Sequence, residues 1–210
     1  MNECPQDHSA DRLSRSEEQT LISQARSGCQ ASARKLVESH GDRLFAFVWR
    51  IRRDHHDTEE ICQDAFLRAF ASLDSFLPEY RFSTWLFTIA YRLCLNSMRR
   101  KPMLSGDVDF TRMAASDVSG DEEVANTEAA EHLKATIWSA VDALSTPQRA
   151  ALLLFYREGQ SCQAIAQVLE MPVATVKSHL HRARSRLRVA LAPAVADETT
   201  ALGLLGLRAG

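Results

Sequence analysis

Apolar residues recur at helical spacing on both sides of a break in the sequence, and this pattern limits the fold more than any other feature of the chain. Pro102 and Gly106 interrupt the helical pattern, and the residues that follow show no apolar periodicity. No run has the sustained alternation of a strand flanked by hairpin turns, and no repeat of fixed period occurs. The sequence therefore predicts an all-α fold of two small helical domains, joined by a flexible acidic linker over residues 102–130.

Charged residues are unevenly distributed along the chain. The formal net charge is -2, yet residues 102–131 hold eight acidic residues and one basic residue, whereas residues 132–190 hold eight basic and three acidic residues. Residues 171–188 contain five Lys and Arg, two His and no acid. A local positive charge on a net acidic chain indicates that one face meets a polyanion, and nucleic acid is the partner we expect.

Several classes of protein are excluded by what the sequence lacks. Its five cysteines are an odd number with no C-x-x-C pair, which predicts neither a disulfide framework nor a cysteine zinc site. The longest apolar run, residues 150–156, is far shorter than the roughly 18 residues of a membrane span. No Gly-rich phosphate loop, nucleophile elbow or pair of catalytic carboxylates appears. We therefore expect a cytoplasmic protein with no membrane insertion, no catalysis of its own, no metal and no cofactor.

Residues 161–188 have the pattern of a helix-turn-helix. Ser161 can cap a short helix, the turn "LEMP" follows, and Pro172 suits the first turn of a longer helix. In this motif the second helix enters the major groove of DNA, N-terminal end first. One face of that helix carries apolar residues at helical spacing and should be buried, namely Val176, Leu180, Ala183 and Leu187.

The string "GQSCQAIAQVLEMPVATVKSHLHRARSRLR" resembles the domain with which bacterial sigma factors of the sigma-70 class read the promoter -35 element. Response regulators with a C-terminal helix-turn-helix have similar strings, so this half alone does not separate the two families. The resemblance implies that the -35 element is contacted by Thr175, Lys177, Ser178, His181, Arg182 and Arg184.

The N-terminal half carries two further strings of the same family. "DTEEICQDAF" resembles the D-x-E-D-x-x-Q-E-x-F helix with which sigma factors grip the clamp helices of RNA polymerase, with Asp64 in place of the usual Glu. Asp57, three residues before Glu60, also predicts a capping-box start for this helix. The resemblance implies that core polymerase is bound by Asp57, Glu60, Gln63 and Asp64.

The next string, "RFSTWLFTIAYRLCLNSMRRK", is similar to the family's promoter -10 helix, although Arg92 and Asn96 stand where Asn and Asp are common. In the family, the loop before it, "LDSFLPEYRF", captures a flipped base of the non-template strand. We expect Phe82 and Trp85 to pack in the core. The residues expected to act on the -10 element are Phe76, Tyr80, Arg92, Asn96, Arg99 and Arg100.

The resemblance covers residues 17–190, and the short linker points to the extracytoplasmic-function (ECF, group IV) branch. It implies an initiation subunit that binds core RNA polymerase and promoter DNA and is held inactive by an anti-sigma factor. The alternative is a free-standing helix-turn-helix transcriptional regulator. The expected organisation is a leader (1–16), a region 2 domain (17–101), the linker (102–130), a region 4 domain (131–190) and a tail (191–210).

Overall fold

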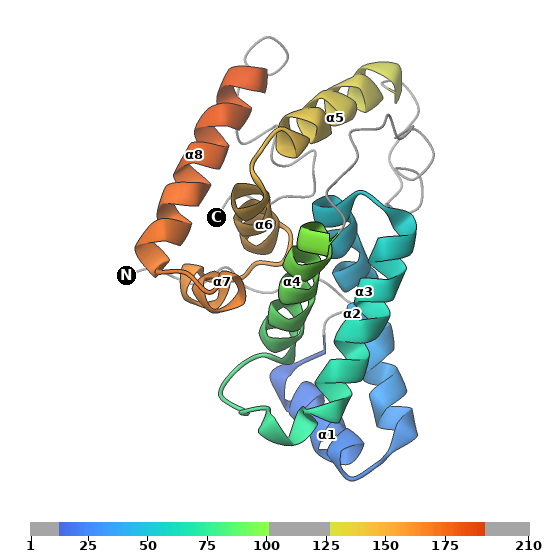
Figure 1. The fold of residues 1–210 in the computed structure, drawn as a ribbon. Helices are drawn as coiled ribbons and strands as arrows, with labels where there is room; N and C mark the ends of the chain where they lie inside the picture. The colour runs from blue at the N-terminus through green and yellow to red at the C-terminus, as the bar shows by residue number, and fades with distance from the viewer. Residues whose placement is uncertain (1–12, 101–126, 192–210) are drawn as a thin grey trace.

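The computed structural model describes residues 13–100 and 127–191, and within them the chain is helical with no strand (Figure 1). The N-terminal group contains α1 (Arg15–Arg26), α2 (Gln30–Arg52), α3 (His55–Ala71), the short 3-10 helix η1 (Leu73–Ser75) and α4 (Phe82–Arg100). The C-terminal group contains α5 (Thr127–Asp142), α6 (Thr146–Tyr156), α7 (Cys162–Leu169) and α8 (Val173–Leu191). The predicted all-α fold is confirmed. Most of the predicted linker and tail, and residues 1–12 of the predicted leader, lie outside the described residues.

Local sequence signals explain where the N-terminal helices start. Ser14 and Glu17 form a reciprocal capping box at the start of α1. Helix α3 begins two residues before Asp57, and its N-cap is Asp54, whose side chain accepts the N–H of Asp57. The expected cap at Asp57 is therefore wrong, because the carboxylate three residues earlier satisfies the first free N–H groups of the helix.

The N-terminal group is organised around α2 and α4. Phe47 of α2 meets Phe87 of α4 edge to face, with ring centroids 5.0 Å apart. Leu36, Leu44 and Leu86 are completely buried in the same cluster. Burying these side chains fixes the direction of α4, and thereby fixes which of its residues reach the surface.

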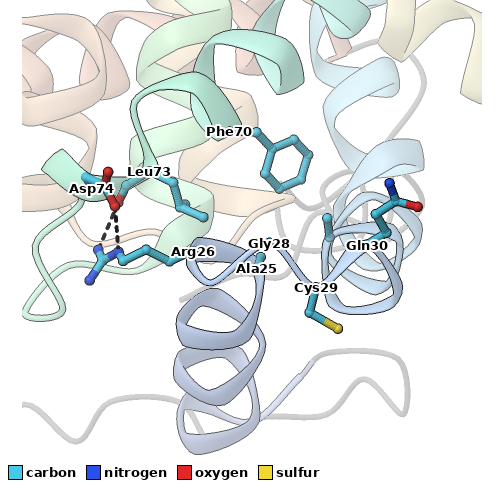
Figure 2. A pocket seen from close by; sticks show the side chains of 9 residues that line it. Ala25, Arg26, Gly28, Cys29, Gln30, Phe70, Leu73 and Asp74 are labelled. Carbon is cyan, nitrogen blue, oxygen red and sulfur yellow. Dashed lines mark hydrogen bonds and ion pairs between the residues drawn. The ribbon is translucent and has the colours of Figure 1, made fainter.

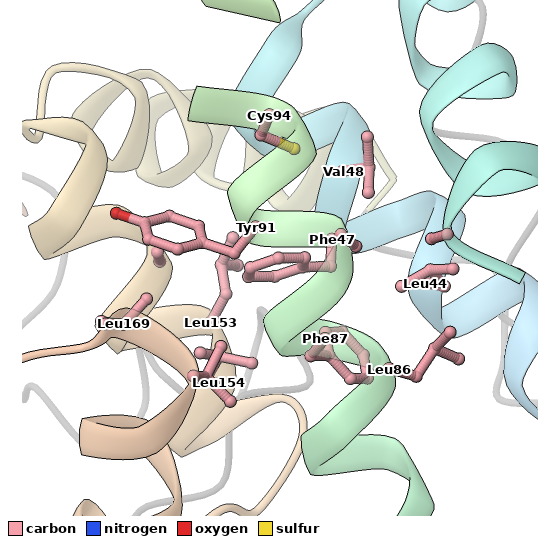
Figure 3. Packing of buried hydrophobic residues seen from close by; sticks show 14 of the residues in the cluster. Leu44, Phe47, Val48, Leu86, Phe87, Tyr91, Cys94, Leu153, Leu154 and Leu169 are labelled. Carbon is pink, nitrogen blue, oxygen red and sulfur yellow. The ribbon is translucent and has the colours of Figure 1, made fainter. Parts of the chain in front are cut away.

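The two helical groups pack against each other and share a hydrophobic core. Helix α4 lies on α7, and α2 lies on α6. Figure 3 shows Tyr91 and Phe87 of α4 beside Leu153, Leu154 and Leu169 of the C-terminal group. A second, smaller cluster holds α5, α6 and α8 together. The chain is therefore folded back on itself, with its two groups in direct contact.

None of the helices described within residues 13–100 and 127–191 is long and apolar enough to cross a membrane.

Candidate nucleic-acid and polymerase interfaces

A tight turn sets the geometry of the C-terminal helix pair. Ser161 caps α7 by accepting the N–H of Ala164, as predicted. Helix α7 ends at Glu170, whose backbone is left-handed (φ 54°), and the N–H of Met171 bonds to the carbonyl of Ala166. This ending stops α7 after eight residues, and only three residues separate α7 from α8. The result is a helix-turn-helix, as expected from the sequence.

Helix α8 separates an apolar face from a cationic face. The predicted inner stripe is confirmed, because Val176, Leu180, Ala183 and Leu187 are all buried. Four of the six expected -35 residues are exposed, namely Lys177, His181, Arg182 and Arg184. Thr175 and Ser178 are half-buried. Since α8 contains no acidic residue, its outer face presents cations without an internal counter-charge.

The outer face of α4 is also cationic. Arg92, Asn96, Arg99 and Arg100 are exposed, as expected for side chains that follow a phosphate backbone. Arg92 forms an ion pair with Glu170 in the turn of the helix-turn-helix. One of the four expected -10 contacts on α4 is therefore occupied by the C-terminal group in this arrangement.

The two aromatic residues expected to capture a base have different environments. Tyr80 is 42% exposed and is available to a ligand. Phe76 is only 4% exposed and packs on Trp85 and Phe82, with ring centroids 5.3 and 6.0 Å away. The ring of Phe76 fills the core where the loop joins α4, so its stacking on a base stays a prediction that this arrangement does not favour. Phe82 and Trp85 pack in this cluster, as predicted.

Helix α3 presents a polar face to solvent. Glu60 and Gln63 are exposed and Asp64 is half-exposed, as expected. Asp57 is 5% exposed, because its carboxylate pairs with Arg52 and accepts the hydroxyl of Ser97 from α4. Asp57 is thus buried, unlike the other three residues expected to bind the polymerase, and its contact with the polymerase stays a prediction.

The structure adds Leu67 to this face, since 60% of this apolar residue is exposed one turn after Gln63. A polar face interrupted by a large apolar side chain is a common feature of protein-binding surfaces. The sequence could have indicated this exposure, because Leu67 is an apolar residue that lies outside the helical stripe of buried residues on α3.

Ionic contacts reinforce the packing between the two helical groups. Nε of Arg43 on α2 donates to Oε2 of the buried Glu158 at 2.8 Å. Arg53 pairs with Asp142 at the end of α5, and the guanidinium of Arg50 lies 3.3 Å from the ring centroid of Trp138. Burial, with the neighbouring Arg157 and Arg149, lowers the pKa of Arg50 to about 10. Cations are therefore crowded at this interface.

No group of three or more His, Cys, Asp or Glu side chains suited to a metal ion occurs in the described part of the chain. The four cysteines described there are free thiols. Burial raises the pKa of Cys62 to about 12, and burial is also the main reason that the pKa of Cys94 rises to about 12. Both thiols are therefore protonated at neutral pH and behave as apolar packing groups.

Two family models match the chain, Sigma-70 region 2 over residues 36–102 and Sigma-70 region 4 over residues 134–187. The chain is 31% identical over 177 residues to the ECF RNA polymerase sigma factor SigW of Bacillus subtilis, a match that covers 80% of this chain and 92% of SigW. It is 30% identical to the ECF RNA polymerase sigma-E factor of Escherichia coli K12, covering 81% and 92% of the two chains.

Among solved structures, CnrH in complex with the cytosolic domain of CnrY matches with a TM-score of 0.62 and 27% identity, covering 85% of this chain and 99% of CnrH. The two matched regions correspond to the helix groups that carry the polar face of α3 and the cationic face of α8. The chain belongs to the extracytoplasmic-function family of sigma-70 class RNA polymerase sigma factors.

Proposed function

We propose that this chain binds core RNA polymerase through the exposed face of α3 and directs it to promoters, with α8 on the -35 element and α4 on the melted -10 element. One observation supports this above all: a single chain carries an exposed acidic and polar face on α3 and an acid-free cationic face on α8. A free-standing regulator that binds operator DNA does not need an exposed acidic and polar face such as that of α3. That alternative is not favoured.

The roles of the α8 residues follow from their positions along the helix. Lys177 and Ser178 lie near its N-terminal end, where a recognition helix approaches base edges, and His181 and Arg182 are one turn further along. These four residues are assigned to reading the sequence. Arg184 lies further from the N-terminus and is assigned to phosphate.

On the -10 element, Arg99 and Arg100 in the last turn of α4 would bind phosphates of the separated strand. Tyr80 offers a ring on which an unpaired base can stack. No step of this role requires catalysis by the chain, because the family consists of initiation factors and the polymerase makes the RNA.

A protein partner of the anti-sigma class is also proposed. The related CnrH was solved in complex with the cytosolic domain of CnrY. This chain covers nearly all of CnrH with the same arrangement of helices, which supports a similar complex with a cytosolic protein domain here. Such an interaction, with the polymerase and the chromosome as the other partners, would place the protein in the cytoplasm.

Transcription in vitro tests the function directly. Core polymerase with the purified chain should initiate at specific sites on a library of promoter fragments, and neither component alone should do so. A chain that protects duplex operators from nuclease without polymerase, and that fails to assemble with core enzyme, would support the regulator instead.

Reversing the charge of Asp64 should weaken the complex with core polymerase. Asp64→Lys changes a half-exposed side chain on the polar face of α3 and should leave the fold intact. The matched control is Glu38→Lys, which reverses an exposed acidic residue on α2. We expect at least a tenfold loss of core affinity, or about 1.4 kcal/mol, for Asp64→Lys only, measured by titration of labelled protein. Equal losses in both variants would show that only net charge matters.

A further inference from the structure

Helix α1 holds the segment between α3 and α4 by its backbone carbonyls. Five side-chain hydrogen bonds run from three α1 residues to this segment. Arg15 donates to the carbonyls of Pro78 and Glu79 at 3.3 and 3.0 Å, and Gln19 donates to that of Pro78 at 3.2 Å. Arg26 donates to the carbonyls of Leu73 and Phe76 at 2.8 and 3.1 Å.

The three α1 residues are spaced so that they reach one side of the helix. Arg15, Gln19 and Arg26 are four and seven residues apart, and Ile22, which is buried, lies between them on the same side. Figure 2 shows Arg26 reaching Asp74, an ion pair of 3.5 Å, at the edge of a cavity of about 180 Å³. Two hydrogen bonds and this ion pair therefore join Arg26 to the segment.

The segment of residues 76–81, called here the α3–α4 loop, has little internal structure of its own. The N–H of Phe76 bonds to Leu73, and that of Tyr80 bonds to Leu77. The buried ring of Phe76 anchors one end of the loop in the core. Two large side chains remain exposed, Leu77 at 53% and Tyr80 at 42%. Side chains of α1 thus bind the backbone carbonyls of the loop, while the side chains of Leu77 and Tyr80 are exposed to solvent.

We propose that Arg15, Gln19 and Arg26 are positioning residues, which hold the α3–α4 loop in the conformation that presents Tyr80 to an unpaired base of the melted promoter strand. This inference rests on the proposed function of the loop. Ordering a flexible loop on binding costs conformational entropy and therefore weakens binding. A loop that the fold already holds in place avoids this cost. Helix α1 thereby contributes to -10 recognition without touching DNA.

The test measures binding of holoenzyme to promoter DNA with a pre-melted -10 bubble, using all four bases in turn at each unpaired position. Tyr80→Ala should weaken binding by about 5- to 150-fold, the effect of losing one stacked base. Arg15→Ala and Arg26→Ala should each weaken it by about fivefold or more. Core affinity and -35 duplex affinity should not change. Arg34→Ala, which removes an exposed cation from α2, is the matched control.

A double-mutant cycle separates positioning from general destabilisation. If Arg15 acts through Tyr80, then Arg15→Ala should have little further effect in a Tyr80→Ala background. Additive effects would overturn the positioning role. A Tyr80→Ala holoenzyme that binds the bubble as tightly as wild type would overturn the proposed function of the loop itself. A Tyr80→Ala defect with normal Arg15→Ala and Arg26→Ala variants would remove only the role of α1.

Discussion

Arg182→Ala is expected to weaken binding of the holoenzyme to its preferred -35 sequence by about 5- to 150-fold, the range for loss of one good base contact of about 1–3 kcal/mol. The preference at one base pair should be lost at the same time. Arg182 is exposed on the outer face of α8, and the adjacent Ala183 belongs to the buried stripe, which the substitution leaves intact. The free energy of unfolding should therefore change little.

Arg184→Ala supplies the contrast within the same helix. A phosphate contact carries no sequence information, so its loss should weaken binding to all -35 sequences alike and reduce the salt slope by about one. Binding to promoters with randomised -35 positions, measured at several salt concentrations, distinguishes the two outcomes. An unchanged base preference in Arg182→Ala would show that this residue does not read the promoter.

The elements that could be predicted from the sequence are those fixed by short-range patterns. The buried stripe of α8 follows from helical periodicity, and the start of α7 follows from the capping preference of Ser161. The cationic face of α8 follows because a helix with one apolar face must turn its charges to the other. These features depend on residues within a few turns of each other, which is why the sequence is sufficient.

Features set by contacts between distant segments could not be predicted in this way. Asp57 fits a surface motif, but Arg52 and Ser97 surround its carboxylate and bury it. Phe76 fits a base-stacking position, but its ring completes a cluster with Trp85. The hydrogen bonds from α1 to the α3–α4 loop join residues about sixty positions apart. No local pattern carries information about such partners.

The contact between the two helical groups has a direct consequence for promoter binding. The -10 and -35 elements are separated by about 25 base pairs, or about 85 Å along a straight duplex at 3.4 Å per base pair. In the structure α7 lies against α4, and Glu170 pairs with Arg92. Helix α8, with 19 residues, is only about 28 Å long. We therefore expect the groups to separate before α4 and α8 bind their proposed elements.

The groups are held together by apolar packing and by ionic contacts. Their interface combines apolar packing around Tyr91 with a crowd of cations that includes Arg50, Arg53 and Arg149. Burial lowers the pKa of Arg149, and burial is also the main reason that the pKa values of Arg50 and Arg53 are lowered. Confining these charges opposes docking, so ion pairs such as those of Arg53 with Asp142 and Arg43 with Glu158 offset part of this cost.

Arg43→Glu should separate the two groups in the free protein. The substitution places a carboxylate against Glu158, whose side chain is only 2% exposed, and loss of a partner from a buried ion pair costs about 3–5 kcal/mol. Small-angle scattering should then report a larger radius of gyration, while Arg34→Glu, on the same helix, should stay compact. Because we expect promoter binding to require separated groups, Arg43→Glu should bind core polymerase and promoter at least as tightly as wild type. An Arg43→Glu protein that remains as compact as wild type would show that this ion pair does not hold the groups together.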